Sequence, residues 1–118
     1  MALDYFDWEA GDVIVFHLTG PITLGQGTSK LRALIDDTLK CGKKKILLNM
    51  SEVYNMDSSG LGELVAAYNK VIQEGGTLKL MKLTRRVHDL VQLTKIYRLF
   101  EVYDDEDTAV RSFKQSDG

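Results

Sequence analysis

The sequence predicts an α/β fold, a mixed sheet of about five strands with about four helices packed mainly on one face. Short apolar runs typical of buried strands alternate along the 118 residues with segments whose apolar positions recur every three or four residues. Alternation of this kind builds parallel β-α-β units. The first two strand-like runs are separated only by a short turn, so they are expected to form an antiparallel hairpin at the edge of the sheet.

Two runs flank the turn of this N-terminal hairpin. The segment Asp12–Thr19 contains the apolar run Val-Ile-Val-Phe and is followed by Gly20 and Pro21, the pattern of a buried strand that ends in a turn. The segment Leu3–Trp8 is expected to pair with it through the turn at Glu9–Asp12. The aromatic residues of this segment are expected to pack across the two strands.

A helix and a central strand follow the hairpin. The segment Gly25–Lys40 is predicted to be an amphipathic helix, and Thr28 or Ser29 can cap its start. Its apolar face consists of Leu31, Leu34, Ile35 and Leu39. The segment Lys45–Met50 has a continuous apolar centre, as expected for a strand that is covered on both faces.

The next helix is predicted over Ser58–Glu74, because Gly75 and Gly76 end the helical pattern there. One face of this helix is expected to carry Leu61, Leu64, Val65, Tyr68 and Ile72. A strand over Thr77–Met81 follows directly.

The last third of the chain is predicted to add two helices and one strand. Thr84 is expected to cap a helix whose apolar positions are Val87, Leu90 and Val91. The segment Leu99–Tyr103 is expected to form a short strand, and Asp105–Lys114 a final helix with an acidic first turn. The inward positions of this helix are expected to be Ala109, Val110 and Phe113.

Length and composition predict one domain over residues 1–118, with a monomer as the simplest state, because no low-complexity stretch marks a boundary. The net charge of −2 argues against nucleic acid as a partner, since phosphate backbones are bound by clustered Lys and Arg. The short basic runs Lys43–Lys45 and Arg85–Arg86 are expected to be solvated surface charges. No secretory signal and no apolar run of bilayer length is seen, so a cytoplasmic location without membrane contact is expected.

Residues that could support metal binding or catalysis are few. Cys41 is the only cysteine, which excludes an intrachain disulfide, and it is expected to be at least half-buried. No Cys/His cluster with zinc spacing exists, so no metal site is expected. His17 is expected to be a strand residue with a satisfied ring and His88 a surface residue, and neither is placed as the base of a serine hydrolase. The run Gly25–Gly27 lacks the rest of a nucleotide-binding fingerprint, so neither enzymatic activity nor a cofactor is expected.

The most informative run is Met56–Gly62, which lies between an apolar strand and the first turn of a strongly amphipathic helix. It places hydroxyl groups at a helix N-terminus, where unpaired backbone N–H groups and the helix dipole favour a phosphate. Ser58 is therefore the candidate for reversible phosphorylation. Asp57 is expected to accept backbone N–H bonds and shape the turn, and Leu61 to begin the buried stripe that anchors it. The alternative is that Asp57 and Ser58 only cap the helix.

Two glycines near Ser58 fit the same hypothesis. Gly60 and Gly62 carry no side chain, so they are expected to let a kinase active site approach the Ser58 hydroxyl, despite a helix-propensity cost of about 1 kcal/mol each.

These residues resemble the STAS domain and, more narrowly, the bacterial anti-sigma factor antagonists. The resemblance is carried by Ile46–Ser51, by Met56–Gly62, and by the Gly75–Gly76 break with the strand after it, and it covers nearly the whole chain. One departure lies in the turn after the second strand. Many members of the family place an acidic residue there, whereas this chain reads Gly20–Gly27 with Thr23 at its centre, which affects the partner contacts expected at this turn.

The resemblance implies a phosphorylation-controlled partner switch. Ser58 would be the phosphoacceptor, and the residues implied in partner binding are Asp57, Ser58, Ser59, Gly60, Leu61 and Gly62. The unphosphorylated form would bind an anti-sigma factor serine kinase and so release a sigma factor, which is only an indirect partner. Phosphorylation would release the kinase, and a serine phosphatase would reset the switch. The alternatives are a STAS interaction or scaffold module, a soluble subunit of a transport complex, and a ligand-sensing STAS domain that binds a nucleotide or lipid beside the loop.

Overall fold

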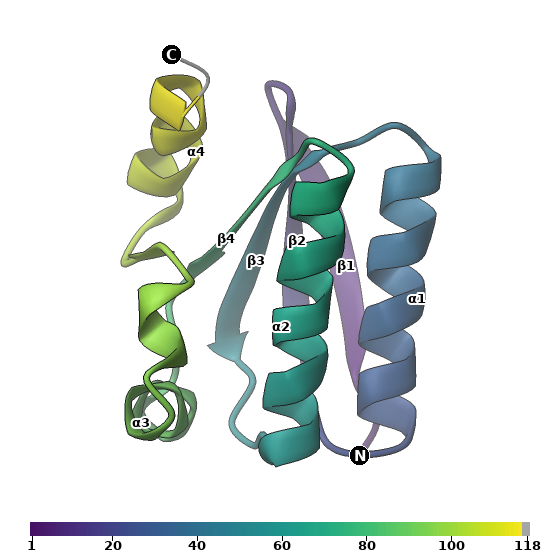
Figure 1. Cartoon of the computed structure of the whole chain (residues 1–118), viewed down its shortest axis with the longest axis vertical. Helices are drawn as coiled ribbons and strands as arrows, with labels where there is room; N and C mark the ends of the chain where they lie inside the picture. The colour runs from purple at the N-terminus through teal and green to yellow at the C-terminus, as the bar shows by residue number, and fades with distance from the viewer. Residues whose placement is uncertain (117–118) are drawn as a thin grey trace.

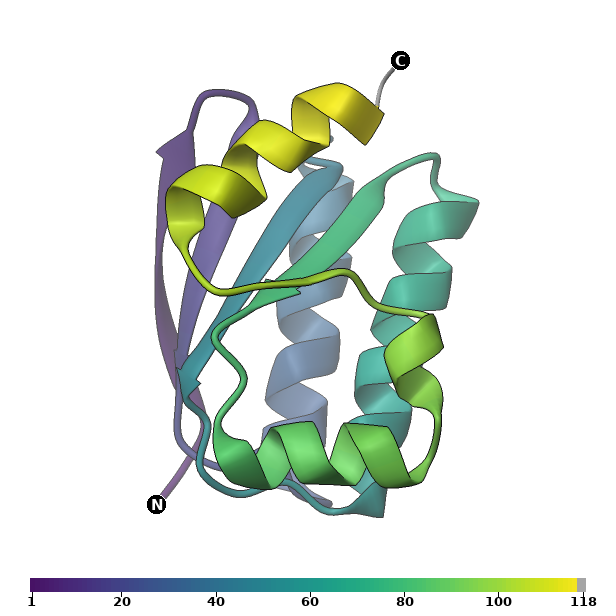
Figure 2. The ribbon, with the colours of Figure 1, turned by 90° about the vertical axis from the view of Figure 1, so that its left-hand side faces the viewer.

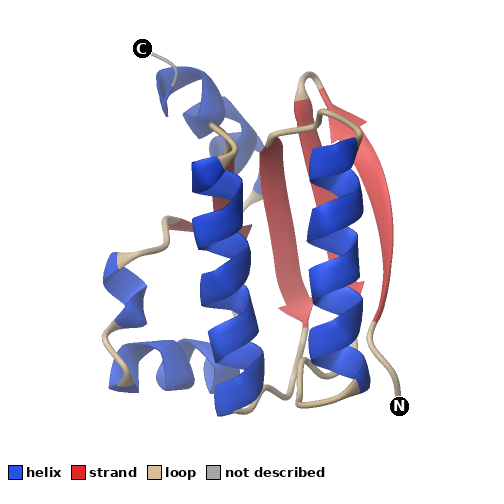
Figure 3. Ribbon diagram, turned by 45° about the vertical axis from the view of Figure 1, so that its right-hand side comes forward, coloured by secondary structure: helices blue, strands red, loops and turns tan. Residues whose placement is uncertain are grey.

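A computed structural model describes residues 1–116 and contains one mixed sheet with strands in the order β1-β2-β3-β4-β5 (Figure 3). The strands are β1 (Asp4–Ala10), β2 (Val13–Thr19), β3 (Lys45–Glu52), β4 (Thr77–Met81) and β5 (Val102–Tyr103). Strand β1 is antiparallel to β2, and every other neighbouring pair is parallel. The predicted hairpin and β-α-β units are therefore confirmed.

The helices cover both faces of this sheet unequally. They are α1 (Gln26–Lys40), α2 (Ser58–Gln73), α3 (Arg85–Leu93), the single 3-10 turn η1 (Ile96–Arg98) and α4 (Glu106–Ser116). Helices α1 and α2 lie side by side against one face (Figure 1). Helix α4 lies across the opposite face, while α3 crosses the end of the molecule (Figure 2).

Successive side chains along each strand point to opposite faces of the sheet, so the buried side chains form two clusters, one on each face. Phe16 and Leu48 face α1 and α2, and they belong to a large cluster that also includes Leu31, Ile35 and Leu64. On the other face, a smaller cluster under α4 consists of Val13, Val15, Leu47, Met81, Ala109 and Phe113. Each large side chain buried in this way contributes about 1.5–3 kcal/mol relative to exposure. The sheet is therefore a fixed platform for the loops at its ends.

A lysine is buried beneath α4, and no local sequence pattern indicates its burial. The Lys79 side chain is 1% exposed, and its ammonium donates hydrogen bonds to the Ser112 hydroxyl at 2.9 Å and carbonyl at 3.2 Å. The same group forms an ion pair with Glu101 at 3.3 Å. These contacts compensate the desolvation of the charge and tie α4 to β4.

Four local predictions were wrong. Helix α1 is capped by Gly25, whose φ of 107° disfavours other residues, while Thr28 lies in the first turn. Val71 rather than Ile72 faces the core from α2, and Ile72 is 47% exposed. The strand predicted over 99–103 is reduced to Val102–Tyr103, because Leu99 has a helical backbone conformation and closes η1. Cys41 is exposed, because it lies one residue beyond the end of α1.

Among the described residues, none of the helices has the length and apolar character needed to cross a lipid bilayer.

Candidate functional site

The candidate site lies at the edge of the sheet where the parallel strands have their carboxyl ends. The connections that follow β2, β3 and β4 all emerge at this edge, which is where ligands and partners of α/β sheets commonly bind. The connection after β3 leads directly into α2, and Ser58 is the first residue of that helix. The predicted position of Ser58 at a helix N-terminus is therefore confirmed.

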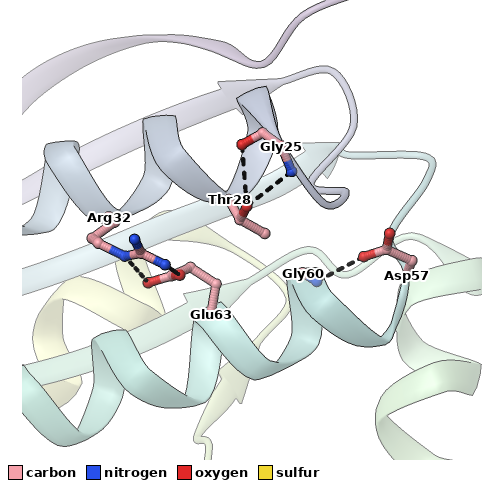
Figure 4. Close-up of polar contacts among 6 residues, drawn as sticks. All are labelled: Gly25, Thr28, Arg32, Asp57, Gly60 and Glu63. Atoms are coloured by element: carbon pink, nitrogen blue, oxygen red, sulfur yellow. Dashed lines mark hydrogen bonds and ion pairs between the residues drawn. The ribbon is translucent and has the colours of Figure 1, made fainter.

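Asp57 joins two of these connections. Its Oδ1 atom accepts the backbone N–H of Gly60 at 2.7 Å and so caps α2 (Figure 4). Its Oδ2 atom accepts the backbone N–H of Leu24, 33 positions away in the sequence, at 3.0 Å. One carboxylate thus fixes both the start of the helix and the loop before α1.

These N–H donors, first that of Leu24 and then that of Gly60, hold the pKa of the Asp57 carboxyl below its ordinary value. A lowered pKa in the folded state stabilises the protein at pH values above about 4, which is the pKa of an Asp carboxyl in the unfolded chain. This stabilisation is lost as the pH falls through the pKa that Asp57 has in the folded protein.

We expect Asp57→Asn to unfold at a temperature several degrees below that of the wild type at pH 7, and to approach the wild type at pH 3, as measured by circular dichroism. Asp104→Asn removes an exposed carboxylate that accepts no hydrogen bond within the described residues, and it should follow the wild type at both values. A difference for Asp57→Asn that is unchanged at pH 3 would contradict this role.

Gly60 allows the two connections to pack directly against each other. A Cβ atom at this position would lie 1.8 Å from the carbonyl oxygen of Ile22. The contact is reinforced by the backbone N–H of Ile22, which donates to the carbonyl of Asn55 at 3.0 Å, and by a β-bridge between Ile22 and Met56. The structure therefore gives Gly60 an internal packing role in place of the expected opening toward a kinase, whereas Gly62 is exposed with open space around it.

The six residues implied in partner binding differ in accessibility. Ser58 and Gly62 are exposed, Asp57 and Ser59 are half-buried, and Gly60 and Leu61 are buried. The Ser58 hydroxyl forms no hydrogen bond with any residue in the described part of the chain. It is therefore open to solvent at the positive end of a helix of 16 residues.

Helices α1 and α2 are joined by ion pairs close to the site. Arg32 Nη2 donates to Glu63 Oε1 at 2.6 Å, and Nε approaches Oε2 at 3.4 Å (Figure 4). The hydrogen bond to the Glu63 side chain, which is 9% exposed, raises the pKa of the Arg32 guanidinium. Asp36 and Lys70 form a second pair along the same seam. No sequence signal indicated these pairs, because their members are more than 30 positions apart.

Two large apolar side chains project from the connections that frame Ser58. Leu24 is 75% exposed on the loop before α1, and Tyr54 is 70% exposed on the loop before α2. Hydrogen bonds hold the Leu24 loop in place. The Thr28 hydroxyl accepts the backbone N–H of Gly25 and donates to the Gly25 carbonyl, both at 3.2 Å (Figure 4). Exposed apolar groups on a rigid loop are typical of contact surfaces. Neither residue was predicted from the sequence to be exposed.

The histidines lie in settings that match their predicted structural roles. Asn49 Nδ2 and Glu52 Oε2 lie 3.1 and 2.8 Å from the two ring nitrogens of His17, which also stacks on Phe6. His88 is exposed. Neither ring is hydrogen-bonded to Ser58. Within residues 1–116, no three His, Cys, Asp or Glu side chains are grouped so that they could hold a metal ion.

Comparison with known proteins places the chain in a family. The chain belongs to the STAS domain family, whose sequence pattern matches residues 9–109. It is similar to the anti-sigma F factor antagonist of Paenibacillus polymyxa, 28% identical over 100 residues that cover 83% of this chain and 84% of that protein. It is also similar to a Thermotoga neapolitana protein provisionally named an anti-sigma factor antagonist, 34% identical over 93 residues that cover 79% and 82% of the two chains.

The same fold is found in solved structures of an anti-sigma factor antagonist. SpoIIAA in its unphosphorylated form matches with a TM-score of 0.68 and 17% identity, covering 94% of this chain and 98% of that one. The phosphorylated form, from Bacillus, matches with a TM-score of 0.70 and 18% identity, covering 92% and 98%. The predicted STAS-like α/β fold is thereby confirmed.

Proposed function

We propose that this protein is an anti-sigma factor antagonist that works as a phosphorylation-controlled partner switch. In its unphosphorylated form it binds an anti-sigma factor serine kinase, and the sigma factor is released without contacting this chain. The kinase then transfers the γ-phosphoryl group of ATP to the Ser58 hydroxyl, and this phosphorylation dissociates the complex. A serine phosphatase hydrolyses the phosphoserine and resets the switch. The protein itself catalyses none of these steps.

The observation that carries this proposal is the exposure of the Ser58 hydroxyl at the start of α2, on a loop fixed by Asp57 and Gly60. A helix N-terminus stabilises added negative charge, so phosphorylation should leave the fold intact. The names of the Paenibacillus and Thermotoga relatives, and the phosphorylated form of SpoIIAA, support the same assignment.

Leu24 is a further proposed contact of the partner kinase. In the turn that contains Thr23, many members of the family carry an acidic residue, and here the exposed Leu24 follows instead. Because Asp57 holds the Leu24 backbone beside the start of α2, one partner surface can cover both Leu24 and Ser58. We therefore propose an apolar contact at this turn in place of an electrostatic one.

The test is affinity capture from a lysate of the organism that encodes the chain, with ADP or ATP added and retained proteins identified by mass spectrometry. The baits are the wild type, Ser58→Ala and Ser58→Asp. We expect a serine kinase of the anti-sigma type with the wild type and Ser58→Ala, and its loss with Ser58→Asp. Identical partner sets for all three baits would contradict the switch and favour a scaffold module.

A further inference from the structure

A shallow groove with basic walls lies at the carboxyl ends of β3 and β4, next to the Ser58 loop. Its volume is about 460 Å³. This basic groove is lined by Ser51, Tyr54, Lys82, Leu83, Thr84, Arg85 and Arg86. It shares the connection between β3 and α2 with the candidate phosphorylation site, because Tyr54 and Asp57 both belong to that connection.

Hydrogen bonds hold the two walls of the basic groove in place. The Thr84 hydroxyl, although at the N-cap position of α3, donates to the carbonyl of Val53 at 2.7 Å and so ties α3 to the Tyr54 loop. Lys82 has a φ of 56°, in the left-handed region, and its N–H donates to the carbonyl of Tyr103 at 2.8 Å. The aromatic wall and the cationic wall are therefore fixed relative to each other.

The cations of the basic groove are largely uncompensated. Three of them occur within five residues, without an acidic residue between them, in a chain of net charge −2. Arg85 has only a long contact of 3.9 Å with Asp89, and its side chain is 94% exposed. Lys82 and Arg86 form no ion pair with any other residue that the structure describes. Lys82 interacts with an acidic group only at longer range, where its charge contributes to lowering the pKa of the Asp105 carboxyl. Exposed cations at this density attract a partner of opposite charge.

The form of the basic groove favours a peptide over a small molecule. Small-ligand sites bury most of the ligand surface, whereas Tyr54 and Arg85 both extend into solvent here. An extended acidic segment can place successive carboxylates along the cations and cover the Tyr54 ring. We propose that the basic groove docks an acidic peptide segment of a partner protein through Lys82, Arg85 and Arg86. This contact goes beyond the phosphorylation of Ser58 and does not depend on it.

The test is an NMR titration of the ¹⁵N-labelled full chain with a glutamate-rich ten-residue peptide at low ionic strength. We expect saturable shifts confined to the amides of Tyr54 and residues 82–86, which weaken as salt is added. Arg85→Glu combined with Arg86→Glu should weaken the peptide affinity about tenfold or more. The matched control, Lys40→Glu combined with Lys44→Glu, reverses two exposed cations near the amino end of β3 and should retain the affinity.

Two results would overturn the proposal. Shifts that spread over basic residues elsewhere, or that persist in the double Arg variant, would show unspecific attraction. Inorganic phosphate that produced the same shifts at a lower concentration than the peptide would indicate a site for a small anion. Because neither the kinase nor Ser58 takes part in this titration, failure here leaves the proposed switch untouched, and failure of the switch leaves this result standing.

Discussion

Gly60→Ala is expected to destabilise the protein by about 3 kcal/mol or more, and to lower the midpoint of thermal unfolding by about 10 °C or more. The added Cβ atom would meet the carbonyl oxygen of Ile22 at 1.8 Å, and a backbone atom cannot move aside as a flexible side chain can. The start of α2 must therefore separate from the loop before α1. Chemical and thermal unfolding followed by circular dichroism measures the effect.

Gly62→Ala is the matched control, because it makes the same change two residues further along the helix. Apart from its chain neighbours and the adjacent backbone of its own helix, no atom lies within 4 Å of the added methyl group there. Replacing an exposed helical glycine by alanine should stabilise the protein by about 0.5–1 kcal/mol. Equal stabilities of the two variants would show that the contact between Gly60 and Ile22 is not a constraint on the fold.

Phosphorylation of Ser58 is expected to weaken binding of the serine kinase about 100-fold or more, and Ser58→Asp to weaken it about tenfold or more. A phosphoserine adds about 1.5 to 2 negative charges. If the docked kinase presents nucleotide phosphates or carboxylates at this point, like charges in contact cost several kcal/mol, and 1.4 kcal/mol is a tenfold change in affinity. Titration calorimetry with the captured kinase measures both affinities, with Ser58→Ala as the reference.

Two comparisons separate this effect from damage to the fold. Ser58→Asp should unfold no earlier than the wild type, because a negative charge at a helix N-terminus is stabilising by about 0.3–1 kcal/mol. Asn69→Asp places the same charge on an exposed position of α2, about 16 Å further along the helix, and should leave the affinity unchanged. A loss of affinity in Asn69→Asp equal to that in Ser58→Asp would indicate a general charge effect.

The elements that the sequence predicted best are those whose signal is local. The helix from Ser58 was predicted to within one residue at its end, because the Asp57 cap, the apolar spacing and Gly75 all lie within or beside it. The strand Thr77–Met81 was predicted with its observed bounds for the same reason. The start of α1 was predicted to within one residue, but its capping residue was wrong, because several residues there can cap a helix and packing of the preceding loop decides that Gly25 does so.

The candidate site was predictable only in part. Ser58 and Asp57 could be placed at a helix start from their immediate neighbours. The bond between Asp57 and Leu24, and the close approach of Gly60 to Ile22, join residues more than 30 positions apart, so no local pattern encodes them. Exposure of Leu24 and Tyr54 likewise depends on how three connections meet at one edge of the sheet. Tertiary packing therefore decides which residues surround the serine.

The most direct test of the partner switch is to add ATP to the purified complex of the wild-type protein with its captured kinase. Peptide mass spectrometry locates the phosphate while size-exclusion chromatography follows the complex. We predict phosphorylation on Ser58, and dissociation in step with it that Ser58→Ala does not show. A complex that stays intact after Ser58 is fully phosphorylated, or a phosphate on another residue, would contradict the account.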